Sequence, residues 1–364
     1  MNYSKEMYYS IKDQSGYAGL IYAVLGVFII GSPLTVYLMM TKLPKNVKGI
    51  ETFRYLLSSC LISSSSLVVI RAIWVPIPTL PIMEVYSAGI IRHLGPIANL
   101  ICLNLYVACF VNMQICGTFC LIYQFSALKP FSRISCLGNC PNRAKMCYAT
   151  YLIVMVTILS IFIHISVVDR STFYQYALET KNEYITEIIN SEPSWIGFSA
   201  ALKPTIIGFG IFATIPDLCV ASLAIFLTTK IWFIMEADKS RVSALTQSLE
   251  RNLYHTFLIR TSVLVIFYTL PYMGIAATIF FEIQIPKLGI IFHSIISFQV
   301  ILLLLGTLVM IKPFRVYLFG CCIKKKVHDS SSSNSNGSNT LPTTMTATNT
   351  SQSILPPIKI KNFI

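Results

Sequence analysis

Polar side chains inside long apolar stretches are the groups of this sequence that could do chemistry. Asp217 follows Pro216 near the middle of the stretch 205–233, and it is the only acidic residue well inside such a stretch. A carboxyl group at that depth in a membrane is costly, so it indicates a ligand site or a switch. The alternative is a protonated or hydrogen-bonded carboxyl group that only packs the interior. The sequence leaves both interpretations equally open.

Other polar residues could line one outward-opening cavity with Asp217. Asn99 and Tyr106 are seven residues apart, so they share a helix face to within about 20° at 100° per residue. The predicted ligand-binding set is Asn99, Tyr106, Trp195, Asp217, Tyr272, His293 and Gln299. Such polar groups often only bridge neighbouring helices, at about 0.6 kcal/mol each. Because pockets place few polar groups among many apolar ones, we expect about half of the set to contact ligand.

Two prolines and two arginines inside the apolar stretches have expected roles of their own. Proline removes a backbone hydrogen bond and kinks a helix, so Pro216 and Pro271 are predicted hinges. Membrane helices also tolerate proline without any motion, which is the alternative. Arg71 and Arg260 lie near the ends of their stretches. Long cationic side chains at such positions are expected to extend to the membrane surface. The alternatives are anion binding by Arg71 and pairing of Arg260 with the segment 123–125.

The sequence has no motif typical of an enzyme, a cofactor site or a metal site. It contains no phosphate-binding loop, no His-Glu-x-x-His and no plausible nucleophile triad, and Cys136 with Cys140 are too few for zinc. The net charge of +13 could suggest nucleic acid. Its basic residues, however, form short clusters between apolar runs, with no basic patch interleaved with aromatic residues. We therefore predict neither catalysis nor nucleic-acid binding.

The elements that must position these residues are membrane-spanning helices. The chain of 364 residues is 54% hydrophobic and 12% charged. This apolar content exceeds what one soluble core needs. A helix crosses about 30 Å of hydrocarbon with roughly 20 residues. Seven stretches meet this requirement, at 16–40, 55–75, 95–123, 147–168, 205–233, 257–281 and 288–311. The predicted fold is an all-α membrane protein, a bundle of seven transmembrane helices.

The predicted organisation places the N-terminus outside the cell and the C-terminus in the cytosol. Lys and Arg concentrate in alternate loops, and such loops stay in the cytosol. The segments are an extracellular N-terminus at 1–15, the helical domain at 16–320 and a disordered tail at 321–364. The domain ends in a short amphipathic eighth helix at 313–320. Asn2 begins an N-glycosylation sequon on the outer side, whereas the sequons at Asn336 and Asn349 would stay unmodified.

The cytosolic tail contains candidate modification sites. Cys321 and Cys322 precede three consecutive lysines, which predicts palmitoylation and attraction to anionic membrane lipid. Two unmodified thiols are the alternative. The Ser and Thr residues of the tail are plausible phosphorylation sites for an arrestin-like partner. An unregulated tail fits the same sequence.

Several short segments resemble those of one receptor family. Pro33 with the basic segment 37–48 resembles the first span and inner loop of the nematode serpentine chemoreceptors, which are G-protein-coupled receptors. The segments 245–250, 270–272 and 310–315 (Met-Ile-Lys-Pro-Phe-Arg) are similar to later signatures of that superfamily. Class H is the most similar class, with the Str and Sri classes as neighbours. The resemblance covers residues 17–320.

This resemblance implies a receptor in the plasma membrane of a sensory neuron, in its cilium, that binds a small odorant-like or pheromone-like molecule. It also implies activation of a heterotrimeric G protein. The implied coupling residues are Tyr123, Gln124, Phe125, Lys129, Arg241, Lys312 and Arg315. Gln124 departs from the family, whose members often have Arg there. An ion channel or transporter subunit is the alternative, although a pore needs intramembrane charges in pairs or rings. An accessory member without a ligand is a third.

Overall fold

The computed structural model describes residues 11–42, 50–79, 83–128, 141–181, 183–237, 251, 254–255, 258–259, 261–281 and 287–310. Several predictions fall outside these residues. They concern Asn2, Lys129, Cys136, Cys140, Arg241, Arg260, Lys312, Arg315, Cys321, Cys322, the eighth helix at 313–320 and the tail.

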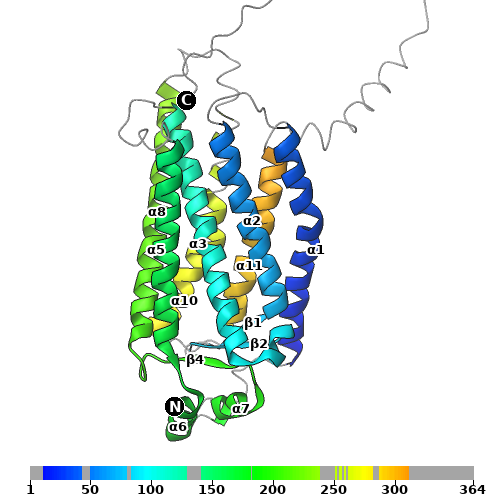
Figure 1. The fold of residues 1–364 in the computed structure, drawn as a ribbon, viewed down its shortest axis with the longest axis vertical. Helices are drawn as coiled ribbons and strands as arrows, with labels where there is room; N and C mark the ends of the chain where they lie inside the picture. Colours follow the sequence, from blue (N-terminus) through cyan, green and yellow to red (C-terminus); the bar gives the residue numbers. More distant parts are fainter. Residues whose placement is uncertain are drawn as a thin grey trace, which may run out of the picture.

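Within the described residues, seven helices are long and apolar enough to cross a membrane, and they run side by side along the molecule (Figure 1). They are α1 (Ile11–Lys42), α2 (Ile50–Trp74), α3 (Gly95–Leu128), α5 (Pro141–Ser166), α8 (Thr205–Ala237), the segment formed by residues 261–264, η3 (Val265–Thr269) and α10 (Leu270–Phe280), and α11 (Leu288–Met310). Each overlaps one of the seven predicted spans. The predicted seven-helix membrane fold is therefore confirmed.

Local sequence explains where several of these helices begin and end. Proline is favoured in the first helical turn because the amide hydrogen that it lacks has no helical partner there. Pro96 and Pro141 occupy the starts of α3 and α5. Conversely, α2 ends at Trp74, where Val75 has a positive φ of 45° and Pro76 cannot continue the helical hydrogen bonds. These boundaries fix how far each helix extends.

The helix surfaces that face away from the bundle are apolar. Large exposed side chains such as Ile30, Ile153, Phe212 and Phe233 project outwards from the bundle. Inside, one buried cluster joins α3, α5 and α8, and another joins α1, α2 and α11. Burying the interior against other helices while leaving an apolar outer surface is what a hydrocarbon solvent permits.

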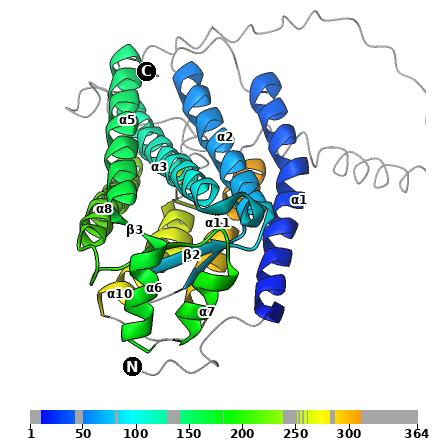
Figure 2. The ribbon, with the colours of Figure 1, turned by 60° about the horizontal axis from the view of Figure 1, so that its bottom comes forward.

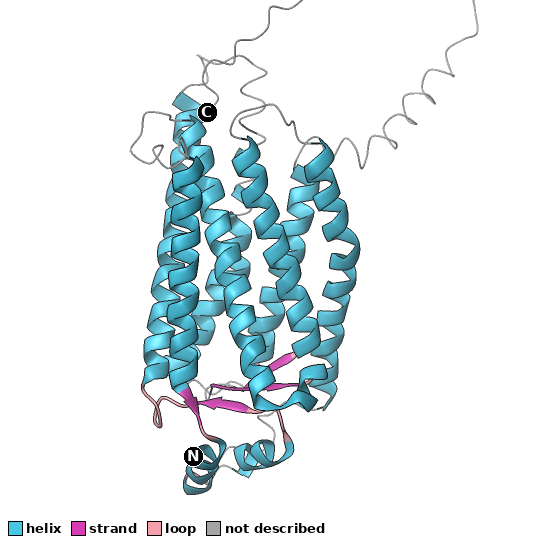
Figure 3. Ribbon diagram, in the orientation of Figure 1, coloured by secondary structure: helices cyan, strands magenta, loops and turns pink. Residues whose placement is uncertain are grey.

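A small antiparallel sheet crosses one end of the bundle, which we call the sheet end (Figures 2 and 3). Its strands are β1 (Pro76–Thr79), β2 (Met83–Ser87), β3 (Val167–Val168) and β4 (Ile196–Phe198), in the order β1-β2-β4-β3. Strands β2 and β4 come from two distant connections and pair, with Val85 opposite Ile196, while β3 and β4 of the same connection pair with Val168 opposite Gly197. The sequence did not predict this sheet.

Two further helices complete what we call the sheet cap: strands β1–β4 with η2 (Ile90–Leu94), α6 (Arg170–Glu179) and α7 (Glu183–Ser191). Its core contains Phe173 and Trp195, whose ring centroids lie 5.0 Å apart. Gly197 lies under this pair so closely that a Cβ atom there would meet the Trp195 ring. The long connection 169–204 is thus a folded layer over the bundle.

Candidate functional site

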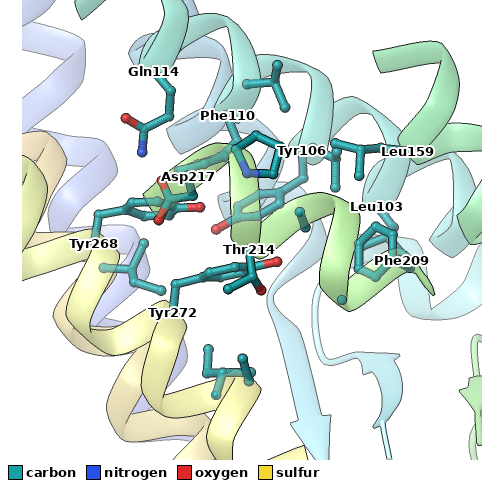
Figure 4. Close-up of a pocket in the computed structure, with 18 of the residues that line it drawn as sticks. Leu103, Tyr106, Phe110, Gln114, Leu159, Phe209, Thr214, Asp217, Tyr268 and Tyr272 are labelled. Atoms are coloured by element: carbon teal, nitrogen blue, oxygen red, sulfur yellow. The ribbon is translucent and has the colours of Figure 1, made fainter. Parts of the chain in front are cut away.

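An internal cavity of about 400 Å³ lies between α3, α5, α8, α10 and α11, with β1 and β2 at its sheet end (Figure 4). Most of its lining is apolar. The polar side chains that line it are Tyr106, Gln114, Thr214, Asp217, Tyr268, Tyr272 and His293, with Trp74 and Tyr151 at its edges. A mostly apolar cavity of this size with a few convergent polar groups is typical of small-molecule sites.

Asp217 occupies the α8 wall of this cavity. Its side chain is buried, with 8% of its surface exposed, and its Oδ2 atom accepts no hydrogen bond from the described residues. It lies close to Tyr268 and Tyr272 of the facing helix (Figure 4). A carboxyl oxygen in this situation has lost its water without gaining a full set of partners, which is energetically costly. The site therefore holds a buried acceptor that has no hydrogen-bond partner among the described residues.

Aromatic rings form a continuous ladder along the cavity. Tyr106 stacks with Phe110 at 6.4 Å between ring centroids, Phe110 with Tyr268 at 4.0 Å, and Tyr268 with Tyr272 at 5.7 Å. Trp74 extends the ladder by an edge contact with Tyr106 at 5.9 Å. The ladder joins α2 and α3 to the helix that contains Tyr268 and Tyr272.

The backbone around Tyr268 is irregular. Residues 265–269 form the π-helix η3, and the amide of Leu270 donates to the carbonyl of Val265, five residues earlier. Pro271 follows directly in α10 and donates no backbone hydrogen bond. Single π-helical turns are rare and occur often at functional sites. The wider turn and the proline together interrupt the regular α-helical hydrogen bonding at residues 265–271.

The predicted ligand-binding residues fall into two groups. Tyr106, Asp217, Tyr272 and His293 line the cavity, as does Pro216. Asn99, Trp195 and Gln299 are not among its lining residues. Trp195 belongs to the core of the sheet cap, while Gln299 faces a second cavity of about 40 Å³, shared with Gln114.

Asn99 fastens the sheet cap to the bundle. Its carboxamide oxygen accepts a hydrogen bond from the indole N–H of Trp74. Its amide nitrogen donates to the carbonyl of Val85 at 2.9 Å and to the carbonyl of Ser194. The side chain is fully buried. All of its hydrogen-bonding groups are thus used inside the protein.

Arg71 does not extend to the membrane surface, so that prediction was wrong. Its side chain has 3% of its surface exposed and points into the bundle. One guanidinium nitrogen donates to the hydroxyl of Tyr17 at 3.1 Å and to the carbonyl oxygen of His293 at 2.8 Å. These bonds join α1, α2 and α11. Buried acceptors that only the folded bundle brings together hold the arginine inward.

Sequence reasoning missed Tyr268, Gln114 and Thr214. Spacing could have found the first two: Tyr268 is four residues before Tyr272, and Gln114 is eight after Tyr106, so each shares a helix face with a predicted residue. It also missed a network at Tyr148, whose hydroxyl contacts Asn112, Ser59 (3.1 Å) and Cys116 (3.3 Å).

The predicted coupling residues that the structure describes lie at the end of α3 away from the sheet. Tyr123 is half-buried there, and Phe125 is buried in the cluster shared with Tyr148 and Tyr254. Gln124 is part of α3, but its side chain is not described. The structure thus makes Phe125 a packing residue in this conformation.

Seven spanning helices around an internal ligand-sized cavity are the architecture of a multi-pass membrane receptor. Residues 12–324 match the family model described as serpentine type 7TM GPCR chemoreceptor Srh, so the chain belongs to this family of G-protein-coupled chemoreceptors. The resemblance seen in the sequence is therefore confirmed. Its members are receptors, a class not generally enzymatic. A comparison with curated proteins gave no match.

Proposed function

We propose that this protein binds a small environmental molecule in the cavity beside Asp217 and responds by activating a heterotrimeric G protein. The supporting observation is a buried, largely apolar cavity in which one carboxyl oxygen lacks a hydrogen-bond partner among the described residues. Family membership supports a chemosensory role. The proposed contacts are Tyr106, Asp217, Tyr272 and His293, together with Tyr268.

The proposed transmission runs through the helix that contains Pro271. A ligand between Asp217 and Tyr272 would touch the segment where the π-helix and the proline have reduced the backbone hydrogen bonding. The part of that helix towards the end opposite the sheet would then swing, with Pro271 as its hinge. Such a swing would open a surface for the G protein near Tyr123, Gln124, Lys129, Arg241, Lys312 and Arg315.

In this proposal the sheet cap faces the outside of the cell. The basic loops support this orientation, because positively charged loops resist translocation. The receptor then lies in the plasma membrane of a sensory neuron, in its cilium. Acylation at Cys321 and Cys322, and an arrestin-like partner for the tail, complete the proposal and stay predictions.

Glycosylation tests the orientation. We expect the full-length protein from eukaryotic cells to carry one glycan at Asn2, because only that sequon would reach the secretory lumen. Asn2→Gln should remove the glycosidase-sensitive shift in electrophoretic mobility. The matched variants Asn336→Gln and Asn349→Gln should leave it intact. A shift that depends on Asn336 or Asn349 would contradict the orientation.

A second-messenger assay tests the receptor activity. Cells that express the chain with a promiscuous G protein are screened with volatile and water-soluble molecules by a calcium readout. We expect a specific response whose maximum falls several-fold in Pro271→Ala, because the restored hydrogen bond stiffens the hinge. Pro33→Ala is the matched control, since Pro33 lies inside α1 and faces outwards.

Two results would count against the proposal. If the Pro271→Ala receptor responds as strongly as the unsubstituted receptor at equal surface expression, Pro271 is not a hinge. A ligand-gated current that persists when G proteins are blocked would show that the protein acts as an ion channel.

A further inference from the structure

The charges around the cavity are unbalanced. Asp217 is the only acidic side chain among the lining residues that the structure describes, and none of these is Lys or Arg. The polar groups that interact with it include the hydroxyls of Tyr268, Tyr272 and Thr269, which carry no positive charge. One carboxylate oxygen has no hydrogen-bond partner among the described residues. A buried carboxylate with no cation is costly, so a positively charged ligand group would gain most by binding there.

The aromatic rings next to Asp217 favour the same charge. Tyr268 and Tyr272 stack with only 16° between their ring planes, and Phe110 stacks on Tyr268. The face of an aromatic ring is electronegative and attracts a cation within about 6 Å of the ring centre. A carboxyl group and several aromatic rings therefore lie close together in one region of the cavity (Figure 4). An anionic group in that region would meet repulsion from both.

The rest of the cavity lining indicates the polarity and charge of the remainder of the ligand. The side chains away from Asp217 include Leu103, Leu159 and Phe209, all apolar (Figure 4). The buried cation Arg71 bonds to the backbone of His293, another lining residue, and so disfavours a second cation on that side. A ligand would therefore place one cationic group at Asp217 and hydrocarbon elsewhere.

We propose that the ligand of this receptor is a small, largely hydrocarbon molecule with one protonated amine. The ammonium group donates hydrogen bonds to Asp217 and lies beside the rings of Tyr268 and Tyr272. This ligand class rests on the proposed function of the cavity as the ligand site. The inference narrows the expected ligand from any small molecule to a lipophilic amine.

Paired compounds test this proposal. The full-length receptor in phosphatidylcholine nanodiscs is titrated with 2-phenylethylamine, n-octylamine and cyclohexylmethylamine, each beside the alcohol and the carboxylic acid of the same skeleton. The readout is the thermal unfolding midpoint, which rises with a ligand that binds only the folded protein. We expect at least one amine to raise the midpoint at concentrations where its alcohol and acid do not.

Variants place the amine in the cavity. Asp217→Asn should weaken binding of that amine about 100-fold, because truncating one partner of a buried charge pair leaves the other charge unpaired. Asp217→Glu should retain much of the affinity. The matched control is Asp169→Asn, an exposed acidic residue of the sheet cap whose loss should change nothing.

Three results would overturn the ligand class: no stabilising amine, an alcohol that stabilises as well as its amine, or equal amine binding to the Asp217→Asn receptor. Nucleotide exchange on a G protein, measured with the same nanodiscs, separates this inference from the function it rests on. If alcohols bind and drive exchange, the receptor activity stands and the amine class fails. If amines bind through Asp217 without any exchange, the amine class stands and the receptor activity fails.

Discussion

Ala213→Trp is expected to abolish the ligand response, with at least about a 100-fold loss of ligand affinity. Ala213 lines the cavity from α8, one helical turn before Asp217 and therefore on the same face. The cavity has a volume of about 400 Å³, and an indole ring there would occupy much of the space that the ligand needs. Because the ring enters existing space, the substitution should destabilise the fold by less than the about 1–3 kcal/mol that is typical of overpacked cores. Dose–response curves at matched surface expression measure the effect.

Ile215→Trp is the control for this substitution. Ile215 lies two residues further along the same helix, but 56% of its surface is exposed on the outside of the bundle. The same bulk added there should leave the response unchanged. A normal response from the Ala213→Trp receptor would mean that the ligand binds elsewhere.

Asn99→Leu is expected to detach the sheet cap, lowering the free energy of unfolding by roughly 3 kcal/mol or more. The substitution leaves the indole N–H of Trp74 and the carbonyls of Val85 and Ser194 without their partner. Each unsatisfied buried group costs about 1–3 kcal/mol. Thermal unfolding of the purified receptor measures the loss, and limited proteolysis should show earlier cleavage within 167–204.

Asn104→Leu provides the comparison on the same helix. The amide of Asn104 donates only to the carbonyl of Leu100, within α3, at 2.8 Å. Its replacement leaves no group of the sheet cap unpaired and should cost little. Equal destabilisation by the two substitutions would show that Asn99 does not act through the sheet cap.

The helices could be predicted because a membrane imposes a simple rule on sequence. A spanning segment must be long, apolar and internally hydrogen-bonded, and all three properties can be read within about 20 residues. The sheet follows no such rule. Its strands are two to five residues long, two prolines interrupt β1, and β2 pairs with β4 more than a hundred residues away. Pairing at that distance depends on the folded helices.

The site was partly predictable for a related reason. Asp217 stands out because of its depth in an apolar stretch, which the sequence shows directly. Asn99 and Tyr106 share a helix face as predicted, but a shared face does not fix the depth of each residue. Asn99 lies at the sheet cap, whereas Tyr106 lies at the cavity. The inward position of Arg71 depends on Tyr17 and His293, which only tertiary structure brings near it.

The sheet cap is built without cysteine. None occurs in residues 75–94 or 167–204, so no disulfide can hold these segments together. Hydrogen bonds from Asn99 and the packing of Phe173 against Trp195 hold the layer instead. Its assembly therefore needs no oxidising compartment and no thiol exchange. A reductant at the cell surface should therefore leave this layer folded, because none of its residues is a cysteine.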